Sequence, residues 1–163
     1  MIRTIRILAI TLASILLNSC ATLKPPIITK NYSIEGFQYV FIPATNSLTS
    51  GTGATYGGQY YSSSKTVNPS DVISGILMKE GFILVPELKQ ELADKTLIVN
   101  YGESGRRYIA GGLGGYTIEV TIKFISAKSY ETIYSCTAEG IGATEADDIR
   151  QAITRCLTGL FPK

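Results

Sequence analysis

Residues 116–124 (YTIEVTIKF) alternate between apolar and polar side chains over their whole length. One face of a strand here would carry Tyr116, Ile118, Val120, Ile122 and Phe124, and the other Thr117, Glu119, Thr121 and Lys123. A period of two predicts an antiparallel strand with one buried and one wet face. Residues 133–140 return as its partner after the turn at 126–129. The chain therefore needs a sheet that is covered on one side.

Two helical patterns can supply this cover. The first follows Asn68, a suitable N-cap, with Pro69 as the first helical residue and Gly81 past the end. The second spans residues 143–161, where Thr144 can cap the helix. Each helix carries an apolar stripe that would face the sheet.

Short strand-forming segments at 37–42, 82–85 and 96–101 complete the pattern, with Ser104–Gly105 as a turn and 107–110 beginning the returning strand. We expect an α+β fold, a two-layer sandwich. Its sheet would be mixed, mostly antiparallel and of about five strands, with two main helices on one face.

Residues 46–66 are rich in Ser, Thr, Gly and Tyr and are predicted to be a flexible loop. A loop of this length is uncommon in a compact domain unless it is functional or disordered. One interpretation is a mobile insertion or a ragged hairpin. The other is a contact loop in which Tyr56, Tyr60 and Tyr61 bind a partner, because Tyr on a Gly/Ser background is typical of binding loops.

The N-terminal segment has Arg3 and Arg6 before an apolar run at 7–17, which is too short to span a bilayer. It ends in Leu17-Asn18-Ser19-Cys20 and resembles the signal peptide and lipobox of bacterial lipoproteins. The resemblance implies cleavage after residue 19 and lipid on Cys20, which would attach the chain to a membrane. Ala21, where retention signals place Asp, then indicates the outer membrane, with the protein facing the periplasm.

This interpretation divides the chain into three parts. Residues 1–19 are the signal peptide, residues 20–35 the lipidated cysteine and a proline-containing tether, and residues 36–163 a single α/β domain. Without Arg3 and Arg6, basic and acidic residues are equal in number at 13 each. A neutral domain is not expected to bind nucleic acid.

The sequence lacks the residue and the motif that catalysis or metal binding would commonly use. It has no His and no GxSxG, so we expect neither an enzyme nor a metal or other cofactor. The glycines at 111–115 lead into a strand and so do not resemble a phosphate-binding loop. The pair Asp147-Asp148 is explained by its place in the first turn of a helix.

Cys136 and Cys156 lie on the predicted inner face of a strand and on the apolar stripe of the last helix. The sequence leaves two states open. The oxidising envelope favours a disulfide between them, whereas free cysteine also behaves as a small buried hydrophobe.

Residues 81–85 (GFILV), 93–99 (ADKTLIV) and the strand pair 116–124 and 132–140 resemble small α/β domains of envelope lipoproteins. The related families include the curli-secretion lipoprotein and the TolB N-terminal domain. This resemblance implies a non-enzymatic envelope protein that docks to other proteins.

The sequence suggests three hypotheses for function. It leaves the oligomeric state open. The first is a lipid-anchored interaction or accessory module, whose partner is another envelope protein. The second is a small-ligand or glycan binder that stacks sugars on Tyr56, Tyr60, Tyr61, Tyr101 and Tyr108. The third is a ring-forming secretion component. The polar row from Thr117 to Lys123 is a second candidate contact surface beside residues 46–66.

Overall fold

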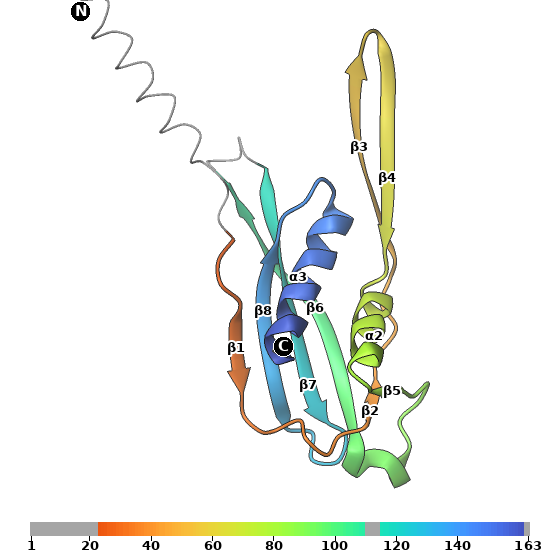
Figure 1. Cartoon of the computed structure of the whole chain (residues 1–163), viewed down its shortest axis with the longest axis vertical. Coiled ribbons are helices and arrows are strands. Elements are labelled where there is room, and N and C mark those ends of the chain that lie inside the picture. The colour runs from red at the N-terminus through yellow and green to blue at the C-terminus, as the bar shows by residue number, and fades with distance from the viewer. Residues whose placement is uncertain (1–22, 110–114, 162–163) are drawn as a thin grey trace, which may run out of the picture.

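The computed structural model describes residues 23–109 and 115–161. They form a mixed six-stranded sheet with two helices on one face, and a separate two-stranded hairpin projects from this body (Figure 1). The sheet order is β1 (Ile27–Lys30), β8 (Thr132–Gly140), β7 (Tyr116–Ser126), β6 (Thr96–Tyr108), β2 (Tyr39–Phe41) and β5 (Ile83–Leu84). β2 runs parallel to β5 and β6, and the other neighbours are antiparallel. The predicted α+β fold is confirmed.

The alternating segment forms β7, which lies between β6 and β8. Ile118, Val120, Ile122 and Phe124 are fully buried. The Phe124 ring meets the Tyr134 ring of β8 edge-on, with 5.6 Å between centroids. This apolar face is the centre of the hydrophobic core.

Helices α2 (Pro69–Lys79) and α3 (Glu145–Leu160) cover that face and contact each other. Both begin as the sequence predicts. The Asn68 side chain accepts a hydrogen bond from the Ser70 amide at 3.1 Å, and the Thr144 hydroxyl accepts one from the Asp147 amide at 3.3 Å. A Cβ on Gly140 would lie 1.8 Å from the Asp148 carbonyl oxygen, so glycine lets α3 begin directly against the end of β8.

The predicted turn at Ser104–Gly105 is wrong. β6 follows a short 3₁₀ helix (Gln90–Lys95) and continues to Tyr108, with an irregularity in its pairing with β7 between Glu103 and Gly105. A bulge of this kind accommodates turn-forming residues without ending the strand. Most of the glycine run at 111–115 lies outside the described residues.

The segment predicted as a tether is largely structured. Ile27–Lys30 pairs with β8 as edge strand β1, and the Asn31 amide donates to the Ile133 carbonyl at 2.9 Å. The unpaired edge of β8 offers backbone partners, and the β-branched residues Ile27, Ile28 and Thr29 suit a strand. Pro25 and Pro26 precede β1, where their missing amides cost no sheet hydrogen bonds.

The predicted flexible loop 46–66 is instead a regular hairpin of β3 (Leu48–Tyr56) and β4 (Gln59–Val67). The strands are in register from Leu48 opposite Val67 to Tyr56 opposite Gln59. Gly57 and Gly58 form the turn with φ of 59° and 78°. Positive φ at both central residues matches the twist of a two-residue hairpin, which is why glycine stands at each position.

Candidate functional site

The β3–β4 hairpin carries the longest continuous run of exposed residues in the described part of the chain. Every residue from 51 to 66 is exposed to solvent. Tyr56, Tyr60 and Tyr61 gather at its tip with exposed fractions of 82%, 71% and 59%. The structure therefore brings the three predicted contact tyrosines together on one projection.

The Tyr60 ring lies across the neighbouring strand at Gly53. A Cβ at Gly53 would come within 2.0 Å of the Tyr60 hydroxyl oxygen, so only glycine leaves room for this ring. The Tyr61 hydroxyl donates to Gln59 Oε1 at 3.2 Å. These contacts lie within the hairpin and order its tip.

The base of the hairpin is fixed to the start of α3. The Ser50 hydroxyl accepts a hydrogen bond from the Ala146 amide at 2.9 Å. Lys65 Nζ donates to both carboxylate oxygens of Asp147, at 2.8 and 2.9 Å, and this contact is the main reason that the pKa of Asp147 lies below its usual value. Val67 completes the attachment by entering the core.

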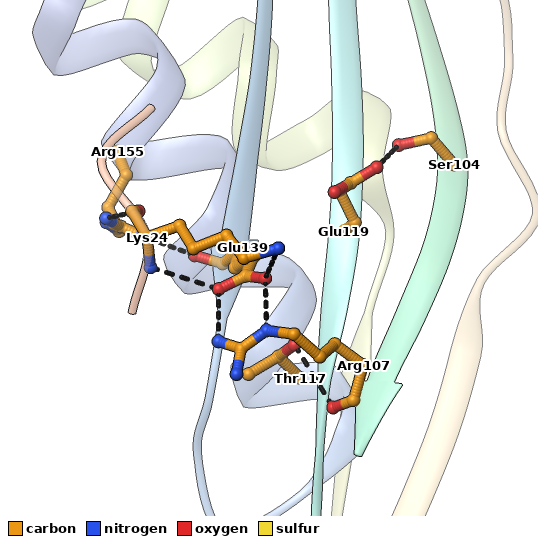
Figure 2. A network of polar contacts seen from close by, with 7 residues as sticks. All are labelled: Lys24, Ser104, Arg107, Thr117, Glu119, Glu139 and Arg155. Carbon is orange, nitrogen blue, oxygen red and sulfur yellow. Dashed lines mark hydrogen bonds and ion pairs between the residues drawn. The ribbon is translucent and has the colours of Figure 1, made fainter. Parts of the chain in front are cut away.

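The sheet face opposite the helices is polar and carries a network of contacts (Figure 2). Arg107 on β6 reaches across β7 to Glu139 on β8, with Nε 2.7 Å from Oε1 and Nη2 2.6 Å from Oε2. The backbone amide of Lys24 donates to Glu139 Oε2 at 3.1 Å. On the other side of Lys24, Arg155 of α3 donates to its carbonyl oxygen at 2.6 Å. The first described residues are thus attached to both layers.

Glu139 is almost fully buried within this network. The hydrogen bonds from Arg107 lower its pKa to about 2, against the opposing effect of burial. The carboxylate is therefore charged throughout the physiological range and acts as the fixed point of the network.

The predicted contact row on this face is only partly available. Lys123 is exposed and Glu119 and Thr121 are half-buried, but Thr117 is fully buried. Its predicted exposure is wrong because the Arg107 side chain passes beside it on the way to Glu139 (Figure 2). Ser104 donates to Glu119 and accepts from Thr121, both at 3.0 Å.

Both edges of the sheet expose apolar side chains, which the sequence did not reveal. On the β1 edge, Ile27 is 69% exposed, and on the β5 edge Ile83 is 54% exposed. Leu84, Leu88 and Met78 are further exposed hydrophobics on or near β5. No other described strand pairs with the outer side of β1 or β5.

Asp148 is the second buried carboxylate, and its environment contrasts with that of Glu139. Its Oδ1 has no hydrogen-bond partner among the described residues, and burial raises its pKa to about 6. Asp147 and Asp148 thus differ in role: the first holds the hairpin, and the second is a buried residue in the first turn of α3.

Cys136 and Cys156 form a disulfide that joins β8 to α3, with 5.5 Å between their Cα atoms. Both residues are fully buried in the core. Cys20 lies outside the described residues.

The tyrosines of the predicted glycan platform are dispersed. Tyr101 is half-buried in the middle of β6 and donates to Glu103 at 3.1 Å, and its pKa is raised mainly by burial. Tyr108 lies at the end of β6 against Tyr116. Neither joins the tip tyrosines, so the structure does not assemble the five rings into one surface.

One open groove of about 570 Å³ lies at the opposite end of the molecule from the hairpin tip, lined by residues that include Leu88, Asp94, Lys128 and Tyr130. In the described part of the chain, no three His, Cys, Asp or Glu side chains cluster as metal ligands would. None of the helices described there has the length and apolarity needed to cross a membrane.

Comparison with known proteins gives a likeness of fold. No family model and no curated protein matches the chain. Among solved structures, the PelC dodecamer from Paraburkholderia phytofirmans is similar, with a TM-score of 0.52 and 14% sequence identity. The match covers 84% of this chain and 98% of that chain.

Proposed function

We propose that this chain is a lipid-anchored subunit of the cell envelope that works by docking to other protein molecules, including copies of itself. The observation that carries the proposal is the pair of apolar sheet edges, neither of which pairs with a further strand among the described residues. An open strand edge is a template for pairing with another chain, and soluble proteins usually guard it with charge, proline or a covering element. Here exposed Ile27 and Ile83 stand at the two edges, beside the partial guards of Lys30 on β1 and the two-residue length of β5.

The two edges differ and lie on opposite sides of the sheet. Contact between them is therefore heterologous, and repeated copies form a closed ring or an open filament. β5 and β1 run in opposite directions, so β5 of one copy meets β1 of the next as an antiparallel pair when both copies point the same way. The PelC structure with a similar fold is itself a dodecamer, which supports testing this chain for self-association.

The anchor and the absence of catalysis rest on the sequence. The lipobox-like Leu17–Cys20 supports lipid on Cys20, attachment to the outer membrane and a periplasmic position. The lack of His removes the commonest general base, which supports a docking role over an enzymatic one.

The test is the mass of the full-length protein in mild detergent, measured over a range of concentrations. We expect a discrete oligomer, and Ile83→Lys or Ile27→Lys should each shift it toward monomer because a charge would be buried between copies. Tyr130→Lys, in the exposed turn between β7 and β8, is the matched control and should leave the mass unchanged. A strict monomer at every concentration would contradict self-association.

A further inference from the structure

We propose that the tyrosine tip of the β3–β4 hairpin rests on the lipid surface into which Cys20 is anchored, so that the domain meets its membrane at two points. This inference rests on the lipid anchor of the proposed function. It assigns to Tyr56, Tyr60 and Tyr61 a membrane interface as their binding partner.

The composition of the hairpin suits a lipid interface. Residues 48–64 contain no charged side chain, and the first charge, Lys65, is engaged at the base by Asp147. Tyrosine rings are amphipathic and concentrate where hydrocarbon meets water, with the ring in the apolar layer and the hydroxyl in the wet one. Three such rings at an uncharged tip match that environment.

The first described residues and the base of the hairpin lie at the same end of the sheet. Lys24 is held on Glu139, next to the last residue of β8, and the hairpin base is held on Ala146 and Asp147 at the start of α3. From there the hairpin projects toward the end from which the chain enters the fold (Figure 1). The tip tyrosines are therefore directed toward the anchored side.

The lengths then bring the tip to the membrane. Cys20 is four residues before Lys24, and four extended residues span at most about 14 Å. The hairpin is fixed to α3 at Ser50, and the seven residues from there to Gly57 give a projection of about 23 Å at about 3.3 Å per residue. This projection is longer than the reach of the tether, so the tip reaches the surface when both point the same way. In an orientation with the hairpin toward the membrane, the tip enters the headgroup layer and the rings meet lipid.

The backbone limits how deep the tip can go. Both outer edges of the hairpin lack partners among the described strands, and unpaired amides are costly in hydrocarbon. The tip therefore stops in the headgroup layer, where water and lipid oxygens can satisfy these groups.

The chain contains no Trp, so a single introduced Trp reports on one position. We would prepare full-length lipidated Tyr60→Trp and Tyr130→Trp and reconstitute each into phosphatidylethanolamine–phosphatidylglycerol vesicles with a fraction of brominated lipid. Tyr130 is exposed to the same degree, 73% against 71%, and lies at the opposite end. Tyr56→Trp repeats the measurement without disturbing the ring contact at Gly53.

We expect brominated lipid to quench Trp at 60 and 56 roughly threefold more than Trp at 130, and iodide in the water to do the reverse, because only the tip lies at the interface. Equal quenching by iodide at both ends would overturn the inference. A blue-shifted Trp at 60 that is insensitive to brominated lipid would also overturn it, in favour of a second protein copy.

Two further measurements test the anchor independently of the tip contact. The mass of the N-terminal peptide reports lipid on Cys20, and flotation with the vesicles reports membrane attachment. A lipidated protein that floats while its tip remains in water leaves the anchor intact and removes the tip contact. A protein without lipid on Cys20 removes both, and the peptide mass identifies that case before any quenching is measured.

Discussion

At the scale of single residues, two buried carboxylates respond to burial in opposite ways. Glu139 keeps its charge because Arg107 and Lys24 surround it, and its pKa falls to about 2. Asp148 has one oxygen without a partner, and its pKa rises to about 6. The first carboxylate stabilises the fold when ionised, and the second when protonated.

Replacing Arg107 with Ala should lower the free energy of unfolding at pH 7 by roughly 2 kcal/mol, because a buried carboxylate loses its charge-assisted hydrogen bonds. In the unmodified protein, the stabilisation from Glu139 is present above its ordinary pKa of 4.5 and is lost as the pH falls toward about 2. The free energy of unfolding of the variant should fall less steeply over that pH range. Urea unfolding between pH 3 and 7 measures both effects, with exposed Arg150→Ala as the control; equal behaviour of the two variants would contradict the role of Arg107.

Asp148→Asn should act in the opposite direction. The pKa of Asp148 is raised from 3.8 to about 6, so its contribution to stability is present at low pH and declines as the pH rises through this range. The amide removes that decline and should raise the free energy of unfolding at pH 7 by roughly 1–2 kcal/mol. Thermal unfolding at pH 4 and pH 7 checks this, and an unchanged pH dependence in the variant would refute it.

At the scale of elements, hydrophobic periodicity predicted the strands and helices that form the core. β7, β8, α2 and α3 each bury a regular apolar row, so their patterns were visible in the sequence. β1 and the β3–β4 hairpin bury almost nothing. The polar, glycine- and proline-containing composition of residues 20–35 and 46–66 therefore reflects their exposure to solvent and does not show that they lack strands. Tyr56-Gly57-Gly58-Gln59 was the missed signal, since Gly-Gly between strand-like segments favours a two-residue hairpin turn.

The candidate site was predictable to the same extent. Tyr56, Tyr60 and Tyr61 stood out by composition, but their placement together at the tip of a hairpin required its strand register. The apolar edge at Ile27 was hidden because residues beside Pro25 and Pro26 were assigned to the tether.

The hairpin should be dispensable for folding. Replacing residues 51–64 by Asn-Gly keeps Ser50 and Lys65, which attach the base to α3, and removes only exposed side chains. The free energy of unfolding should change by less than about 1 kcal/mol. Removing residues 49–66 instead should cost more, because it deletes both attachments. Urea unfolding compares the two deletions. If the variant that lacks residues 51–64 is globally unfolded, the hairpin belongs to the core.

At the scale of the whole molecule, one end and two sides are distinct. The end carries the first described residues and the hairpin, and the two sides are the open sheet edges (Figure 1). The lipid anchor that we propose on Cys20 would orient every copy in the same way with respect to the membrane. In that orientation the β5 edge of each copy faces the β1 edge of its neighbour, so the anchor and the edges together favour lateral assembly.

The most direct test of docking through these edges is a photo-crosslinking residue at Ile83 in living cells. β5 and β1 are the outermost strands of a six-stranded sheet, so five strand spacings of about 4.8 Å, or about 24 Å, separate them within one molecule. A crosslink between them must therefore join two copies. The account predicts a dimer-sized product in which position 83 is bonded to a peptide containing residues 24–30, and the same residue at Tyr130 should give none. Exclusively intramolecular products at Ile83, or none at all, would contradict it.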